Sequence, residues 1–158
     1  MRVRLTVLVS TVLVFALSTA AGEARSTQHA TISLVSVLRT YVPTDVSPKG
    51  LSAGDSVTMT DGLYNAVSQF GKPAGALVGS DTGLEKVLAG KRTASFRGVA
   101  TLPGGTIVIA GRVSLTAAST TAPVVGGTGR FAHAHGTVRF RTLSANGTAS
   151  NVFRLALP

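Results

Sequence analysis

The chain has 158 residues, of which 44% are hydrophobic and 13% charged, a composition that excludes a disordered chain and suits one globular domain. Fifteen Lys and Arg against six Asp and Glu give a net charge of +9, but the lack of Trp and the wide spacing of the basic residues argue against a nucleic-acid-binding protein. Cysteine is absent, which excludes disulfides and leaves burial and strand pairing to stabilise the fold.

The N-terminal segment predicts export. Arg2 and Arg4 precede an uncharged apolar run of about 13 residues, shorter than the roughly 20 that span a bilayer, and small residues suited to signal peptidase follow. This pattern favours a signal cleaved after Ala20 or Ala24 over an uncleaved membrane anchor. We therefore predict a signal peptide over residues 1–24, one domain over residues 25–158, and a secreted protein with no stable membrane anchor after cleavage.

Alternating side chains predict strands in the first half of the domain. Along residues 31–42 the side chains alternate between two faces, which predicts a long strand. The mostly apolar face carries Ile32, Leu34, Leu38 and Val42. The other face carries Ser33, Val35, Arg39 and Tyr41. Residues 43–55 contain two prolines and two glycines, which predict a loop. Shorter strands are expected over residues 56–64 and 75–81.

Two hairpins are predicted in the second half. Residues 92–102 and 105–115 alternate on either side of a Pro-Gly-Gly turn, and residues 136–143 and 149–157 flank a turn that contains Asn146-Gly147. Asn146 also begins a glycosylation sequon, although turn chemistry explains the pair better. Because strands recur and no long helical stripe is present, the pattern favours an all-β sandwich or barrel.

The glycine-rich segment PVVGGTGRFAHAHG, residues 123–136, does not match a nucleotide-binding motif. Gly129 is followed by Arg130 and Phe131, where a phosphate-binding loop needs Gly-Lys-Ser/Thr. His133 and His135 would share a face of a strand, but a metal needs a third ligand that the segment lacks, so we expect no metal site. The glycines are better explained as turn or bulge positions that bring strands close together, with Phe131 in the core.

This segment resembles the characteristic segment of dirigent proteins, in which Pro-Val-Val-Gly-Gly-Thr-Gly is followed by Phe, and it is similar to the Gly-Gly-Ser-Gly segment of allene oxide cyclases. The likeness continues in TDGLYN, LVGSDTG and ATLPGGTIVIAG and covers roughly residues 35–158. The sequence most resembles bacterial members of the allene-oxide-cyclase-like barrel group. The residues before the segment, AASTTA at 117–122, differ from the plant dirigents, so the plant substrate contacts are not carried over.

The resemblance implies a single eight-stranded antiparallel β-barrel, commonly trimeric, with a cavity at one mouth for a hydrophobic small molecule. We expect no cofactor. In such a barrel the interior side chains restrict the conformations of a reactive intermediate. In the plant relatives this steers the coupling of phenoxy radicals or a cyclisation.

Six residues are candidates for the site. Asp61 lies in the segment that resembles the family's acidic Asp-x-x-Leu pattern and is the leading catalytic candidate, because a buried carboxylic acid can protonate or orient an intermediate. Tyr64, three residues later, is a candidate hydroxyl donor. The alternative for Asp61-Gly62 is a turn. The candidate ligand contacts are Arg39, Tyr41, Asp81 and His135. Asp81 is flanked by glycines, so it is also a candidate turn residue, and His135 stands where the resembling family has Arg.

Two functions remain open from the sequence. The first is a secreted protein that gives stereochemical control to the cyclisation or coupling of a reactive hydrophobic intermediate. The second is non-catalytic: a secreted binder of hydrophobic ligands or a cell-surface structural module. A barrel with a cavity that Asp61 faces would favour the first, and a barrel filled with side chains would favour the structural module.

Overall fold

The computed structural model describes residues 27–90 and 92–158 and shows a closed barrel of eight antiparallel strands. The prediction of an all-β, eight-stranded antiparallel barrel is confirmed. The predicted signal peptide lies outside the described residues. The elements are β1 (Gln28–Thr44), β2 (Ser56–Asn65), β3 (Leu77–Val87), β4 (Thr93–Leu102), β5 (Gly105–Ser114), β6 (Ser119–Gly127), the 3-10 helix η1 (Gly129–Phe131), β7 (His135–Ser144) and β8 (Thr148–Leu157).

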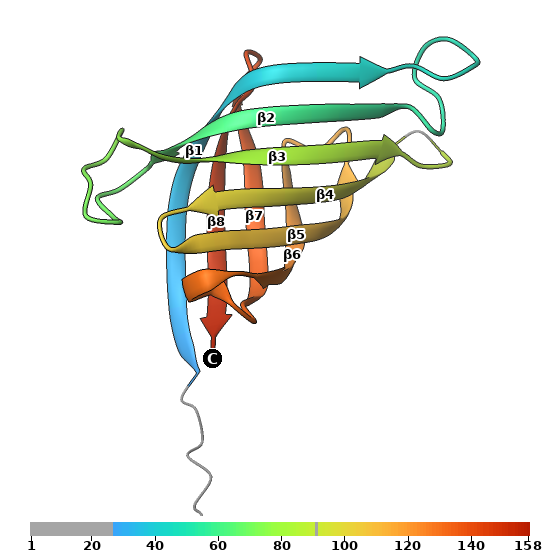
Figure 1. Cartoon of the computed structure of the whole chain (residues 1–158). Coiled ribbons are helices and arrows are strands. Elements are labelled where there is room, and N and C mark those ends of the chain that lie inside the picture. The colour runs from blue at the N-terminus through green and yellow to red at the C-terminus, as the bar shows by residue number, and fades with distance from the viewer. Residues whose placement is uncertain (1–26, 91) are drawn as a thin grey trace, which may run out of the picture.

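The strands follow one another around the barrel, and β1 closes it by pairing with β8. The first part of β1 pairs with β8 from Gln28 to Val37, and its second part pairs with β2 from Leu34 to Thr44. Figure 1 shows this long strand bending from the direction of β8 into the direction of β2. One bent strand therefore joins the two groups of strands that cross in the picture.

A bulge in β1 changes which side chains face the interior. Leu38 pairs with Asp61 and Thr40 with Thr60, so Arg39 is an extra residue in β1. Side chains alternate on either side of the bulge, but the extra residue shifts the alternation by one. Tyr41 therefore lines the interior, while Arg39 lies over Gly62 on the outer face. The prediction that Arg39 and Tyr41 share one face is wrong for this reason.

One predicted strand is too short, and one strand was not predicted. The strand expected over residues 75–81 runs from Leu77 to Val87, and residues 119–127, for which no strand was predicted, form β6. In β6, Pro123 faces outward opposite Thr137. The two predicted hairpins are present as β4–β5 and β7–β8.

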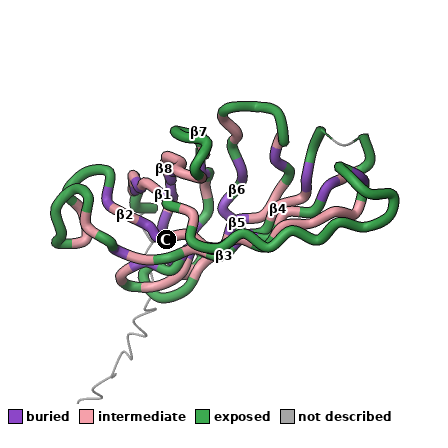
Figure 2. Tube along the Cα trace, turned by 90° about the horizontal axis from the view of Figure 1, so that it is seen from above, coloured by how far each residue is buried: buried purple, intermediate pink, exposed green. Residues whose placement is uncertain are grey.

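The side-chain core fills one end of the barrel. Buried positions alternate with exposed ones along the strands (Figure 2). The largest buried side chains of this core include Phe131, Phe153, Leu34 and Ile107, each at most 2% exposed. Phe131 follows β6 in η1 and inserts into this end, which confirms its predicted place in the core.

The glycines of residues 126–129 allow two turns to touch. Gly129 has a φ of +59°, and a Cβ on it would overlap the carbonyl oxygen of Gly104 in the β4–β5 turn. A Cβ on Gly105 would in turn overlap the carbonyl oxygen of Thr128. The backbone N–H of Arg130 donates to the carbonyl oxygen of Gly104 at 2.8 Å. The segment therefore closes the filled end of the barrel by backbone contact, which only glycine permits.

Candidate functional site

The other end of the barrel is hollow. A cavity of about 330 Å³ lies between side chains that come from all eight strands. Eight-stranded barrels are just wide enough either to be filled by side chains or to hold one small ligand. Here the two arrangements share one barrel, with the core at the Phe131 end and the cavity at the end that carries Tyr41, Met59 and Phe140.

Two carboxyl groups face each other in this cavity. Asp61 on β2 and Asp81 on β3 are direct cross-strand partners, and their side chains hydrogen-bond to each other. Burial, repulsion from the Asp61 carboxylate and the hydrogen bond between them raise the pKa of Asp81 to about 8. Burial also raises the pKa of Asp61, partly offset by the hydrogen bond to Asp81. At neutral pH the pair therefore shares a proton.

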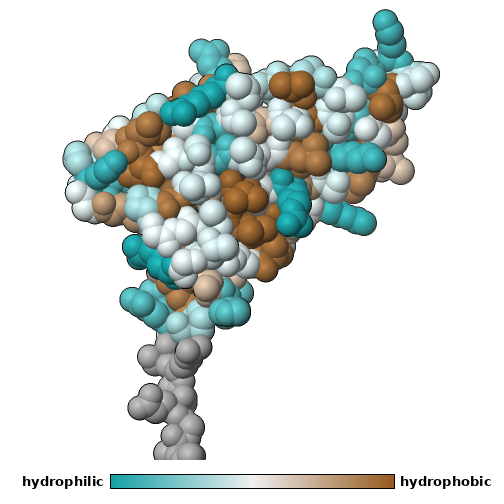
Figure 3. All heavy atoms as spheres, in the orientation of Figure 1, coloured by the Kyte–Doolittle hydropathy of each residue, from teal (hydrophilic) through white to brown (hydrophobic). Residues whose placement is uncertain are grey.

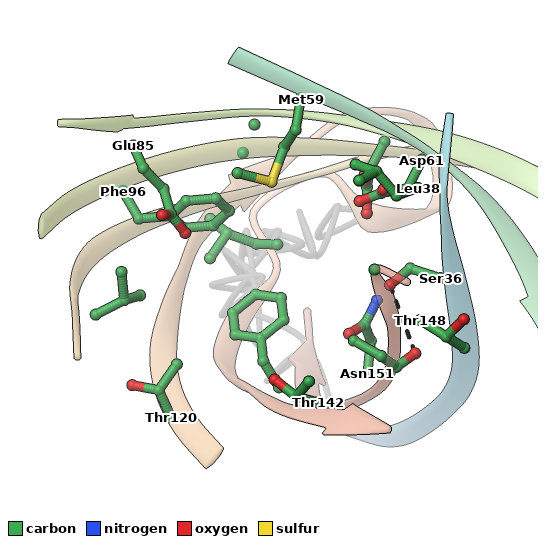
Figure 4. A pocket seen from close by; sticks show the side chains of 18 of the residues that line it. Ser36, Leu38, Met59, Asp61, Glu85, Phe96, Thr120, Thr142, Thr148 and Asn151 are labelled. Atoms are coloured by element: carbon green, nitrogen blue, oxygen red, sulfur yellow. Dashed lines mark hydrogen bonds between the residues drawn. The ribbon is translucent and has the colours of Figure 1, made fainter. Parts of the chain in front are cut away.

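Some polar atoms of the wall lack a partner. The Oδ1 atoms of Asp61 and Asn151 are buried without a hydrogen bond, and Asn151 is 2% exposed. Both atoms belong to cavity-lining residues, and Figure 4 shows Asp61, Ser36 and Asn151 along one wall. A buried polar atom without a partner costs about 1–3 kcal/mol. Because both atoms are acceptors, a ligand with N–H or O–H donors would remove that cost.

The opposite side of the cavity combines aromatic rings with a third carboxyl group. The rings of Phe96 and Phe140 meet edge to face with centroids 5.6 Å apart. Glu85 on β3 is the direct cross-strand partner of Phe96 on β4, and burial raises the pKa of Glu85. Met59 lies near both in Figure 4. This side offers polarisable apolar surface around one acidic group.

The cavity lies beside the weakest seam of the barrel. Strands β5 and β6 pair only at Ile107, Val108 and Ile109. Beyond that point the ladder ends, although Gly111 still faces the Pro123 ring, and residues 114 and 117–120 line the cavity. A second cavity of about 340 Å³, under the loop between β1 and β2, shares Tyr41, Met59 and Glu85 with the first. The hollow therefore continues from the barrel interior to this loop.

Three of the six predicted site residues line the main cavity: Asp61, Asp81 and Tyr41. The other three do not. Tyr64 is three residues from Asp61 on the same strand, which places it on the opposite face of the sheet. Arg39 is the outward-facing bulge residue, and His135 lies exposed at the start of β7.

The alternative prediction, that Asp61 and Asp81 are turn residues, is wrong. Asp61 and Asp81 both lie inside strands, paired with each other and with Leu38 and Ala100 on their other sides. His133 precedes β7 with a φ of +60°, so it does not share a strand face with His135. Within residues 27–90 and 92–158, no three His, Asp or Glu side chains are grouped as metal ligands.

Sequence reasoning missed Glu85, Asn151, Phe96 and Phe140. Glu85 is four residues after Asp81, so alternation alone would have placed it on the same face had the strand been extended past Asp81. Asn151 and Phe140 are direct cross-strand partners in β8 and β7, but which face of the hairpin points inward depends on barrel closure. Their sequence pattern carries no mark of a site.

The comparisons agree with this architecture. The family model described as dirigent-like protein matches residues 35–157. A pyocyanin demethylase structure has a TM-score of 0.67 and 22% identity, covering 80% of this chain and 99% of its own. The Diels-Alderase AbmU from Streptomyces koyangensis has a TM-score of 0.67 and 24% identity, covering 88% and 72%.

The pterocarpan synthase dirigent protein GePTS1 has a TM-score of 0.61 and 16% identity, covering 94% of this chain and 98% of its own. At these identities the structures establish the shared fold, while the activity has to be argued from the site. No curated protein sequence matches the chain.

Proposed function

Since the chain belongs to the dirigent-like protein family, we propose that its barrel binds a hydrophobic small molecule and gives stereochemical control to the cyclisation or coupling of a reactive intermediate. The single observation that carries the proposal is the Asp61–Asp81 pair, held inside a cavity whose other walls are largely apolar. Structures with this fold include a Diels-Alderase and a pterocarpan synthase dirigent protein, which supports a bond-forming or ring-forming reaction.

The carboxyl pair supplies an acid and a base at one place. Asp81, whose pKa is raised to about 8, carries the proton at neutral pH and donates it to an oxygen of an electrophilic intermediate. A hydroxyl group of the same intermediate adds to the activated carbon, and its proton passes to the Asp61 carboxylate. One proton leaves the pair and one returns, so the step is redox-neutral and the pair is regenerated.

The walls determine which face of the intermediate reacts. The Phe96–Phe140 pair and the wall that carries Ser36 and Asn151 leave a space with distinct sides, so a bound intermediate has one favoured orientation. Holding reacting groups in one geometry both accelerates the reaction and selects one stereoisomer. A non-catalytic container for hydrophobic ligands would use the same cavity but would not need a shared proton.

The test measures product chirality. Prochiral substrates whose spontaneous cyclisation or coupling gives a racemate are incubated with and without the protein, and the products are resolved by chiral chromatography. We expect an enantiomeric excess with the wild type. Asp81→Asn should lower the rate by about 10²-fold or more because it removes the acid, while Arg154→Gln on the outer face should not change it.

The outcomes separate the two functions. Racemic products from every substrate would contradict stereochemical control. An unchanged rate and enantiomeric excess in Asp81→Asn would show that shape alone directs the reaction and would refute the acid–base role. Ligand binding without any change in product would favour the container.

A further inference from the structure

The charges of the molecule are separated between its outside and its hollow. Six acidic residues occur in the chain, and Glu23 lies outside the described residues. The remaining five all line one of the two cavities: Asp45, Asp55, Asp61, Asp81 and Glu85. None of the eleven described Lys and Arg lines either cavity. Figure 3 shows strongly hydrophilic side chains spread over the outer surface.

Glu85 lies where the two cavities join. Glu85, Tyr41 and Met59 line both of them. Phe96 is the cross-strand partner of Glu85, and its ring contacts Phe140 edge to face. Figure 4 shows the Glu85 carboxyl group beside Phe96 and Met59, and Tyr41 and Phe140 line the same cavity. We call these five residues the Glu85 cluster.

This combination recognises one kind of ligand group. Aromatic faces attract cations through the ring quadrupole, most strongly where water is excluded, and a carboxylate adds a direct ion pair. The burial that raises the pKa of Glu85 is not compensated by any basic side chain among the lining residues. An anionic ligand would be repelled there, and a neutral apolar ligand would leave the carboxyl group without a partner.

We propose that the Glu85 cluster binds a positively charged nitrogen of an organic ligand, an ammonium group or a cationic ring nitrogen on an apolar frame. The frame extends toward Asp61 and Asp81. Because Asp81 and Glu85 are four residues apart on β3, their Cα atoms are about 13 Å apart. The inference rests on the proposed function, since it names the class of substrate that the same cavity takes.

Two buried acceptors of the cavity wall also fit this ligand. Asn151 and Asp61 each present an unpartnered Oδ1 atom, which is suited to an N–H or O–H group of the ligand. Glu85 therefore selects a charge, and Asn151 and Asp61 select a hydrogen-bond donor. The net charge of +9 does not oppose this, because at physiological ionic strength fields are screened over about 8 Å.

The titratable groups that face the cavity define its pH dependence. They come from three strands: Tyr41 from β1, Asp61 from β2, and Asp81 and Glu85 from β3. Binding of a permanent cation favours the ionised forms of the three carboxyl groups, whose pKa values burial raises, so the affinity for the cation should rise between pH 6 and pH 9. A neutral ligand should show no such rise.

The test uses three probes with one ring frame, measured by fluorescence titration at pH 8. They are 10-methylacridinium, a permanent cation; acridine, neutral at this pH; and acridine-9-carboxylate, an anion. We expect the cation to bind at least tenfold more tightly than acridine, and the carboxylate not to bind. Glu85→Gln should weaken the cation about tenfold without changing acridine, and Arg154→Gln should change the affinity for the cation by less than twofold.

A second variant covers a folding failure of Glu85→Gln, detected by circular dichroism. Phe96→Leu keeps an apolar side chain but removes the ring, and it should weaken the cation more than acridine. Equal affinities for cation and acridine in the wild type, or an undiminished preference in a folded Glu85→Gln protein, would overturn the proposal. Since the probes do not react, racemic products with an intact cation preference would refute only the proposed function.

Discussion

At the scale of single residues, the carboxyl pair ties the stability of the protein to pH. The ordinary pKa of Asp81 is 3.8, and the folded protein raises it to about 8. Between these values the folded protein holds a proton that the unfolded chain has released. The free energy of unfolding should therefore be highest below about pH 4 for this group and should fall as the pH rises through about 8.

Urea unfolding at pH 5 and pH 9 checks this prediction. We expect the wild type to lose on the order of 2 kcal/mol between the two pH values. Asp81→Asn cannot ionise and should remove at least half of that loss, whereas Asp45→Asn, in the loop after β1, should leave it in place. A loss of the same size in Asp81→Asn would show that the pair is not the source.

At the scale of elements, the contact between two turns closes the filled end. Gly129 and Gly71 both have positive φ, +59° and +68°, but only Gly129 faces backbone, at Gly104, while nothing lies within 4 Å of a Cβ on Gly71. Alanine costs roughly 1–2 kcal/mol for the left-handed backbone at each position. At Gly129 it must also push two turns apart.

We expect Gly129→Ala to lower the free energy of unfolding by about 3 kcal/mol or more and Gly71→Ala by about 1 kcal/mol. Chemical denaturation of both variants measures the difference. Equal losses would mean that the turns separate without cost. The glycine segment would then have no structural role in closing the barrel.

At the scale of the whole molecule, the export signal is a prediction about residues that the structure does not describe. Expressed with all 158 residues in a bacterial host, the protein should be recovered outside the cytoplasm with its N-terminus at Ala21 or Arg25, as intact mass would show. Replacing Leu8 and Val9 by Arg should block export. A full-length mass in the exported fraction would contradict cleavage.

The whole barrel also shows which parts of the site were predictable. Asp61 was found from its match to the family's acidic pattern and Asp81 was named as a weaker candidate, but their pairing depends on the register between β2 and β3. Tyr64 and Arg39 were misplaced for two reasons: three residues along a strand change face, and a bulge shifts the alternation. Glu85 and Asn151 could be assigned to the cavity only once the limits of β3 and the closure of the barrel were known.

By itself the sequence determined seven of the eight strands, the two hairpin turns, the family resemblance and the presence of Phe131 in the core, because these depend on local periodicity and on glycine and proline chemistry. Only the tertiary structure decided which half of the barrel is filled and which is hollow, and that every described acidic side chain borders the hollow. The reason is physical: an interior is made by strands far apart in the chain, and burial, pairing and pKa exist only once those strands meet.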